Sequence, residues 1–532
     1  MSSKNAPQVV TVEGPVQGTV DGNISVFKGI PYAAPPVGAL RWRAPEPVTR
    51  WTDTLQTNAY GDSSLQDWDM CIKAGGGDPR PTSEDCLYLN VWTSQLGVGL
   101  GLLPVMVWIH GGGYVLGAAG LPPYNGKPLA EAGVVVVSVN YRLGHLGFFA
   151  HPALDDEYDG EEKIVNNFGL LDQIAALQWV QRNIARFGGD ESNVTIFGQS
   201  AGGRSVLSLF ASPLAAGLFH KGIAQSVYGL PDVTREDALN QGEALATYFG
   251  LNAGDVTAEE LRALDGNLFW EGKDEKAPPK FGGPVPISGD VVFPKPLFEV
   301  FEAKEQAKLP LIIGNTSDDS SVLDDFGFSS EDVIAILRKI EQYDTVKAFY
   351  PDIADGDEEE LGRQVGRDLL FTTMTHLIAE KQRAVVAPSW RYYFDYIAEK
   401  KREEPPIPKG ARHGDEIPYT MDTVDIAPPT SGYATEEDKA FAQKVSHYWV
   451  EFAKVTTDES TSIAGVVEWP KHIVINIFKP NKTIRFGKDL GNSITLEDNF
   501  MWERIALFGL FLPKLGDLIP KGAESIHSYQ TK

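Results

Sequence analysis

Residues 193–203, NVTIFGQSAGG, constrain the fold more than any other part of the chain. Residues 194–197 form a short apolar, β-branched run, which predicts a buried strand. The pattern G-x-S-x-G centred on Ser200 follows, and residues 201–212 predict a helix. A serine in a tight, glycine-flanked turn between a strand and a helix indicates a nucleophile elbow, in which the hydroxyl stands clear of the backbone. The alternative is a structural serine in a glycine turn, and the strand and helix around it argue against that.

Two groups of backbone N–H donors are expected beside Ser200. The N–H of Ala201 falls at a helix N-terminus, where donors are unpaired and the helix dipole favours negative charge. Residues 110–114, HGGGY, follow the apolar run at 104–109, which predicts a central strand. Three glycines leave backbone N–H groups uncovered by any Cβ, which is what an oxyanion hole requires. A merely flexible glycine loop is the alternative.

Apolar strand patterns alternate with helical patterns through much of the chain. Residues 134–139 and 309–314 are apolar runs, and residues 169–187 have apolar side chains at helical spacing. Strand, helix and strand in alternation predict an α/β fold with a mainly parallel sheet covered on both faces. No repeat or linker divides the sequence, so we expect one domain over residues 1–532, with helical insertions at about 232–290 and 328–384. Further expectations are a hairpin or meander at 9–30, a strand at 87–92, a loop at 67–84, a strand at 390–397, a loop at 398–412 and a helix at 440–455.

The composition excludes several classes of partner. The net charge is −25, with an isoelectric point near 4.8, which argues against nucleic acid or an anionic membrane surface. No apolar run reaches the roughly 18 residues that a membrane span needs. The first ten residues, MSSKNAPQVV, lack the apolar core of a signal peptide, so we expect either an intracellular chain or one whose leader has been removed. No metal or organic cofactor is implied.

A serine nucleophile needs a base within hydrogen-bond reach and a third group that orients the base. Five of the nine histidines follow the strand predicted at 309–314. Only His413 lies in a loop after a strand with a glycine beside it, so His413 is the candidate base. Asp318 and Asp319 directly follow the strand at 309–314. The residues alone do not separate these two as the acid.

The chain has two cysteines, Cys71 and Cys86, with fourteen residues between them. A disulfide would close this loop and contribute about 3 kcal/mol in the chain-entropy description. Two free, buried thiols are the alternative, and the spacing leaves both open.

Several long stretches, in the right order, resemble the type-B carboxylesterase/lipase family, which includes the cholinesterases. The resemblance covers about residues 10 to 505. The stretches that carry it are FKGIPYAAPPVGALRW, SEDCLYLNVW, VWIHGGGY, VNYRLGHLGFF, FGLLDQIAALQWVQRNIARFGGD, VTIFGQSAGG and HGDEIPY.

This resemblance implies an α/β-hydrolase fold, with a large, mostly parallel sheet and helical insertions over the active site. It implies hydrolysis of a small-molecule carboxylic ester through an acyl-enzyme intermediate, without a cofactor. Long-chain lipids, carbamates or amides are alternative substrates of the same machinery, and a non-catalytic binding protein is a further alternative. The implied roles are nucleophile for Ser200, base for His413, oxyanion-hole donors for Gly112, Gly113 and Ala201, and a disulfide for Cys71 and Cys86.

The sequence departs from the family pattern at three places. Residues 314–320, GNTSDDS, resemble the family motif G-x-N-x-D-E-G, so Asp319 takes the acid position in place of a glutamate. Its side chain is one methylene shorter, so its loop must lie closer to His413. Gln199 replaces a glutamate, which removes one buried negative charge, so we expect His413 to lose its proton at lower pH than in relatives. The loop between the cysteines has no tryptophan, the residue that binds quaternary ammonium in cholinesterases, which predicts no preference for choline esters.

Arg204 lies four residues after Ser200, and therefore on the same face of the predicted helix. It could be a cation near the site that favours anionic substrates, or one half of an internal ion pair, and we favour the ion pair. The implied disulfide favours a secreted or periplasmic protein over a cytoplasmic one. The oligomeric state is left open by the sequence.

Overall fold

The computed structural model describes residues 6–97, 99, 101–157, 165–252, 255–271, 286–324, 328–455, 462–471 and 482–510. A large sheet of eleven strands lies at its centre, in the order β20-β19-β16-β15-β12-β11-β9-β10-β8-β4-β3. The strands from β10 to β19 in this order run parallel, and antiparallel strands extend the sheet at both edges. Their bounds are β3 Thr19–Asp21, β4 Ile24–Pro31, β8 Tyr88–Thr93, β9 Leu103–Ile109, β10 Val135–Val139, β11 Gly189–Gln199, β12 Lys221–Gln225, β15 Leu311–Thr316, β16 Ser389–Phe394, β19 Lys482–Phe486 and β20 Ile494–Asp498.

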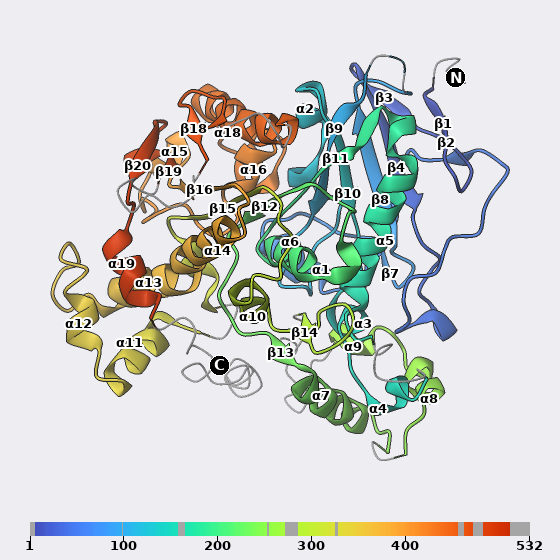
Figure 1. Cartoon of the computed structure of the whole chain (residues 1–532), viewed down its shortest axis with the longest axis horizontal. Coiled ribbons are helices and arrows are strands. Elements are labelled where there is room, and N and C mark those ends of the chain that lie inside the picture. Colours follow the sequence, from blue (N-terminus) through green and yellow to red (C-terminus); the bar gives the residue numbers. More distant parts are fainter. Residues whose placement is uncertain are drawn as a thin grey trace.

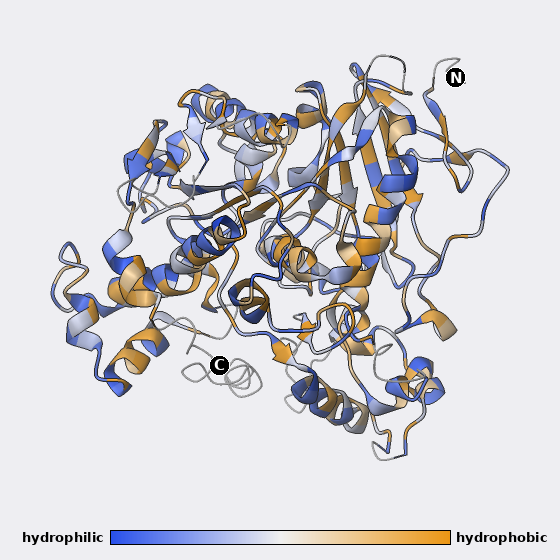
Figure 2. Cartoon of the chain, in the orientation of Figure 1, coloured by the Kyte–Doolittle hydropathy of each residue, from blue (hydrophilic) through white to orange (hydrophobic). Residues whose placement is uncertain are grey.

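The central strands are apolar on both faces because helices cover the sheet on both sides. Successive side chains of a strand point to opposite faces. In β9, Val105 and Val107 pack in one apolar cluster, whereas Met106 and Trp108 pack in the other. Figure 2 shows apolar colours along the central strands and hydrophilic colours on α7, at the periphery.

The two faces of the sheet carry different helices. Side chains of α5 and α6 belong to the cluster of Val105, and side chains of α2 and α18 belong to the cluster of Trp108. Figure 1 shows α2 and α18 above the strands and α6, α10 and α14 below them. The bounds of the helices named here and of the other long helices are α2 Lys127–Glu131, α5 Phe168–Asn183, α6 Ala201–Ala211, α7 Arg235–Tyr248, α10 Leu297–Glu302, α11 Ser330–Lys339, α13 Glu358–Arg367, α14 Thr373–Ala384 and α18 Glu436–Lys454.

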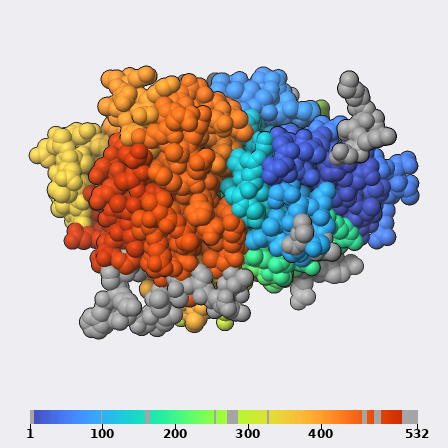
Figure 3. All heavy atoms as spheres, turned by 90° about the horizontal axis from the view of Figure 1, so that it is seen from above, coloured from blue at the N-terminus to red at the C-terminus, as the bar shows by residue number. Residues whose placement is uncertain are grey.

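The two segments predicted as helical insertions both contain helices. The first holds α7, α8 Ala258–Ala263 and α9 Leu268–Glu271, between the paired strands β13 Val233–Thr234 and β14 Ile287–Ser288. Residues 253–254 and 272–285 of this segment lie outside the described residues. The second holds α11, α12 Tyr343–Lys347, α13, the π-helical turn η8 Asp368–Thr372 and α14. Figure 3 shows segments from the two ends of the chain packed side by side on one face.

The remaining short elements connect the larger ones. The expected meander at 9–30 forms, with β1 and β2 in a small separate sheet and β3 and β4 in the main sheet. The bounds are β1 Gln8–Val10, β2 Pro15–Gln17, β5 Leu55–Gln56, β6 Ser63–Ser64, β7 Thr82–Ser83, β17 Ser462–Ile463, β18 Trp469–Pro470, α1 Trp68–Lys73, α3 Gly144–Gly147, α4 Pro152–Asp155, α15 Glu399–Glu403, α16 Ile417–Thr420, α17 Pro428–Ser431 and α19 Trp502–Phe508.

The predicted loop at 67–84 is wrong in part, because it contains the helix α1. The side chain of Asp67 caps this helix and accepts a hydrogen bond from the N–H of Met70 at 3.0 Å. An aspartate at the N-cap is a helix-start signal, but the glycines that follow made the whole stretch resemble a loop. The short helix α15 likewise interrupts the loop predicted at 398–412.

The disulfide implied for Cys71 and Cys86 is wrong, since both thiols are free and buried. Cys71, in α1, packs in the apolar cluster of Trp108, whereas Cys86 packs in the cluster of Val105. Burial raises the pKa of the Cys71 thiol to about 11, and burial also raises the pKa of Cys86. The two side chains therefore behave as apolar core residues in separate surroundings, which is the alternative that the spacing left open.

Candidate active site

Ser200 lies in the turn between β11 and α6, as the elbow motif predicts. Its backbone has φ 57° and ψ −123°, a conformation that is strained for any residue with a side chain. The N–H of Ser200 donates to the carbonyl of Gln225 in the neighbouring strand at 2.9 Å. A Cβ on Gly202 would lie 2.1 Å from the carbonyl oxygen of Ile109. The turn is thus held against the sheet, and only glycine permits this close approach.

The glycine loop after β9 faces the elbow. Gly112 has φ +100°, and a Cβ there would lie 2.4 Å from the carbonyl oxygen of Leu116, so the loop conformation requires glycine. Gly112 and Gly113 line the same cavity as Ser200. Within the described residues, the backbone N–H groups of Gly112, Gly113 and Ala201 have no hydrogen-bond acceptor. These three N–H groups are therefore free to bind an oxyanion.

The structure separates the two candidate acids, which the residues alone left open and the family motif resolved in favour of Asp319. Asp319 accepts a hydrogen bond from Nδ1 of His413 at 2.7 Å through one oxygen, and from the N–H of Thr316 at 2.8 Å through the other. The Asp319 side chain is completely buried. Asp318 instead pairs with Arg363, away from His413. The short side chain of Asp319 reaches His413 because its loop lies against the histidine loop.

Ser200 and His413 open into one cavity of about 1610 Å³. Within the described part of the chain, Nε2 of His413 has no hydrogen-bond partner, so the nitrogen that would take a proton is available in this cavity. The cavity walls are rich in aromatic side chains. These are Tyr124, Tyr228, Phe328, Tyr396, Tyr419 and Tyr433.

Gln199 also lines this cavity, directly before Ser200. It is buried, and among the described residues its side-chain amide nitrogen has no hydrogen-bond partner. A Cβ on Gly414, the residue after His413, would lie 3.8 Å from this nitrogen. A neutral amide therefore lies beside the histidine loop, at the position where the resemblance places a carboxylate.

Glu416, three residues after His413, is a second buried acid that sequence reasoning did not single out. Its only signal was its place in the stretch HGDEIPY. One carboxyl oxygen accepts a hydrogen bond from the hydroxyl of Ser226 at 3.3 Å, and in the described chain the other has no partner. Burial, together with the smaller effect of the nearby charge of Asp319, raises the pKa of Glu416 to about 8. Glu416 is therefore largely protonated at neutral pH.

The raised pKa of Glu416 predicts a pH-dependent stability. Because the folded chain holds this proton up to pH about 8, while the carboxyl of the unfolded chain loses it near 4.5, stability is lost as the pH rises through this window. We expect Glu416→Gln to be more stable than the wild type at pH 8, with little advantage at pH 4.5. Urea unfolding at several pH values measures this, with the exposed Glu259→Gln as the control. Parallel stability curves for wild type and Glu416→Gln would contradict the prediction.

Arg204 forms the internal ion pair that was favoured for it. Its guanidinium contacts the carboxylate of Asp232 and donates to the carbonyl of Tyr228 at 3.1 Å. The second oxygen of Asp232 accepts the N–H of Leu297 at 2.7 Å. Both charged side chains are at most 3% exposed, and Arg204 does not line the cavity in the described chain. Arg204 therefore anchors the segment that forms one cavity wall.

Loss of Arg204 is expected to change stability rather than specificity. Arg204→Met leaves the carboxylate of Asp232 buried without its charged partner, which costs about 3–5 kcal/mol of unfolding free energy. The ratio of rates for an anionic and a neutral ester should stay as in the wild type. Urea unfolding and paired rate measurements test both parts, and the double variant Arg204→Met/Asp232→Asn should recover part of the stability. A selective loss of the anionic ester would instead make Arg204 a substrate-binding cation.

The described residues contain no group of three or more His, Cys, Asp or Glu side chains placed to hold a metal ion. None of the helices in the described ranges has the length and apolar character needed to cross a membrane.

A strained serine at an elbow, a histidine paired with a buried carboxylate, and free N–H donors on a glycine loop define the site of a serine hydrolase on an α/β sheet. Comparison with known proteins makes the assignment specific. Residues 5–487 match the model of the carboxylesterase family, and the chain belongs to this family.

The relatives include a para-nitrobenzyl esterase of Bacillus subtilis (strain 168), 36% identical over 87% of this chain and 92% of that protein. A fumonisin B1 esterase of Sphingopyxis macrogoltabida is 35% identical over 91% of this chain and 86% of that protein. Liver carboxylesterase 1 of Oryctolagus cuniculus is 31% identical over 88% of each. A solved structure of a PNB esterase aligns with a TM-score of 0.76 and 31% identity, covering 97% of this chain and all of that one. The fold is the α/β-hydrolase fold, and the protein is a carboxylic ester hydrolase of the serine type.

Proposed function

We propose that Ser200, His413 and Asp319 form the catalytic triad for ester hydrolysis. The observation that carries this proposal is the 2.7 Å contact between His413 and the buried Asp319, in a cavity that Ser200 also lines. Asp319 fixes the tautomer of His413 with the proton on Nδ1, which leaves Nε2 free to act as a base.

The reaction then proceeds in two halves. Nε2 of His413 takes the proton of the Ser200 hydroxyl while its Oγ attacks the ester carbonyl carbon. The N–H groups of Gly112, Gly113 and Ala201 bind the resulting oxyanion, and each stabilises the transition state by about 3 kcal/mol. His413 gives the proton to the alcohol oxygen, the bond between this oxygen and the carbonyl carbon breaks, and the alcohol departs. The acyl group remains on Ser200 as the acyl-enzyme. A water molecule, deprotonated by His413, attacks the acyl carbon, and the acid is released as Ser200 regains its proton.

The substrates proposed are small carboxylic esters with at least one bulky apolar or aromatic group. A cavity of about 1610 Å³ with tyrosine walls supports this choice, because such walls bury apolar area while their hydroxyls orient polar atoms. The names of the relatives point to esters as well. We do not expect a preference for choline esters, since the segment of α1 that lines the cavity contributes Met70, Cys71 and Lys73 and no aromatic side chain.

We further propose that residues 1–532 act as one catalytic domain, with the helical insertions at about 232–290 and 328–384 beside the cavity. Residues of both segments line this cavity, which supports the proposal. A secreted or periplasmic location rested on the disulfide, and the free thiols remove that argument.

A serine-directed reagent tests the proposed function. Treatment with a sulfonyl fluoride should add one sulfonyl group per chain, abolish hydrolysis of p-nitrophenyl esters, and map to the peptide that contains Ser200. A series of p-nitrophenyl esters of increasing acyl length, beside a choline ester and an aryl carbamate, measures the substrate range. Intact mass spectrometry and peptide mapping give the site of labelling. Hydrolysis that persists in fully labelled protein would contradict the assignment.

A further inference from the structure

Two loops must keep a fixed spacing for the proposed triad to form: residues 316–321, here called the acid loop, and residues 409–414, the base loop. Three hydrogen bonds donated by backbone N–H groups join them directly. The N–H of Asp318 donates to the carbonyl of Ala411 at 2.7 Å, and the N–H of Ala411 donates to the hydroxyl of Ser317 at 2.8 Å. The N–H of His413 donates to the hydroxyl of Ser321 at 3.0 Å. These contacts bring Asp319 within reach of His413.

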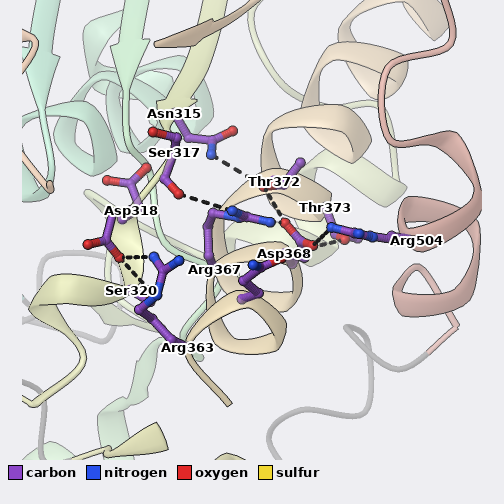
Figure 4. A network of polar contacts seen from close by, with 12 residues as sticks. Asn315, Ser317, Asp318, Ser320, Arg363, Arg367, Asp368, Thr372, Thr373 and Arg504 are labelled. Carbon is purple, nitrogen blue, oxygen red and sulfur yellow. Dashed lines mark hydrogen bonds and ion pairs between the residues drawn. The ribbon is translucent and has the colours of Figure 1, made fainter. Parts of the chain in front are cut away.

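The helix α13 holds both loops from outside the cavity. Arg363 contacts the carboxylate of Asp318, and Arg367, one turn later, donates to the carbonyl of Ser317 at 3.0 Å (Figure 4). Arg363 also donates through two nitrogens to Glu360, at 2.6 and 3.0 Å. The Glu360 oxygen that accepts the 3.0 Å hydrogen bond also contacts the ammonium of Lys409 at 2.9 Å. An ionic chain thus runs from the acid loop, through α13, to the base loop.

We propose that Arg363 is a positioning residue for ester hydrolysis, which clamps the acid loop through Asp318 and, with Glu360 and Lys409, fixes its distance from the base loop. The inference rests on the proposed roles of Asp319 and His413. Arg363 touches neither side chain. It acts through the backbone of Asp318, which directly precedes Asp319.

The ion pairs of Arg363 with Asp318 and Glu360, here called the clamp, are largely buried. The side chains of Arg363, Asp318 and Glu360 are 13–14% exposed, so water screens the contacts among these three only weakly, whereas the side chain of Lys409 is half exposed. Although burial opposes ionisation, hydrogen bonds from Arg363, Gln364 and Lys409 lower the pKa of Glu360 to about 2. Glu360 therefore stays charged across the pH range of ester hydrolysis. Asp319 is too short to follow a loop that moves away from His413, so the spacing of the loops matters more here than with a glutamate.

The test compares variants of the full chain on a p-nitrophenyl ester between pH 5 and 9. Arg363→Met should lower kcat about 10- to 100-fold, because small displacements of reacting groups have effects of this size. KM should stay near its wild-type value, since Arg363 does not line the cavity in the described chain. The second-order rate of sulfonylation of Ser200 should fall in parallel, and Arg363→Lys, which keeps a cation beside Asp318, should recover part of both rates.

Arg338→Met is the control, because Arg338, on α11, pairs with Glu358 at the start of α13 and has no ion pair with either loop among the described residues. Its kcat should equal that of the wild type. Wild-type kcat and sulfonylation in Arg363→Met, or an equal loss in Arg338→Met, would overturn the inference. If Arg363→Met does not fold, Asp318→Asn removes the charge at the other end of the contact, and wild-type kcat there would overturn it instead. Ser200→Ala and Asp319→Asn are measured in parallel: activity retained in both would reject the proposed triad itself, whereas activity lost in both and retained in Arg363→Met would reject the clamp alone.

Discussion

Replacing Ser200 by alanine is expected to lower kcat for ester hydrolysis by about a million-fold, the loss seen when the nucleophile of a serine hydrolase triad is removed. The strained turn at φ 57° places Ser200 in the cavity that His413 also lines, at the end of the strand β11, which is where the elbow motif puts a nucleophile. The residual rate should come from the free N–H donors and substrate binding alone.

The rate is measured with a p-nitrophenyl ester on freshly purified protein, and the control is Ser192→Ala. Ser192 is exposed and lies on β11, the strand that leads to the elbow, so its removal tests for nonspecific effects on this strand. Ser192→Ala should keep wild-type kcat. A Ser200→Ala variant that retains hydrolysis within about tenfold of the wild type would contradict an acyl-enzyme on this residue.

Replacing Asp319 by asparagine is expected to lower kcat about ten-thousand-fold, because it forces the wrong tautomer on the base. The structure gives the reason. The N–H of Thr316 donates to one oxygen of Asp319, so the oxygen of an asparagine would take this position and its NH₂ group would face His413. Nδ1 of His413 would then have to accept a hydrogen bond, and Nε2 would carry the proton.

Asp318→Asn is the matched control for this variant, since it makes the same substitution at the neighbouring aspartate. We expect a loss in Asp318→Asn that is at least a hundredfold smaller than in Asp319→Asn, because Asp318 contacts Arg363 and not the base. The kcat of both variants is measured at the pH optimum of the wild type. Equal losses would mean that the two carboxylates act as one unit.

Much of the site could be predicted from the sequence because it is built from local patterns. The elbow needs a buried strand, small residues around the serine and a helix, and all lie within residues 193–212. The glycine loop likewise follows its strand directly. The resemblance of HGDEIPY to the family placed His413. Each of these features depends on residues that are neighbours in the sequence, so a local motif predicts it.

The choice between Asp318 and Asp319 rested on the family motif alone, because adjacent side chains leave a loop in different directions, and the residues do not say which direction leads to the base. In the structure, Asp318 pairs with Arg363, which lies on α13, 45 residues later in the chain. Asp319 is the aspartate that contacts His413. Arg363 itself gave no signal. On α13 it also pairs with Glu360, three residues earlier, like many solvated helical ion pairs.

The surroundings of Cys71 and Cys86 also could not be predicted from the sequence. Their spacing allowed a disulfide and the family resemblance favoured one, yet the two thiols pack in separate apolar clusters. The partner of Arg204 was also beyond the sequence, because Asp232 lies on the segment that turns back to form a cavity wall.

The sequence by itself determined the fold class and the family, and it pointed to the nucleophile, the base and the glycine loop that we propose, since strand and helix periodicity and short motifs are local. Only the tertiary structure decided the partners of Asp318 and Arg204, the surroundings of the two cysteines and the raised pKa of Glu416. These depend on distance and burial, which arise when segments far apart in the chain pack together.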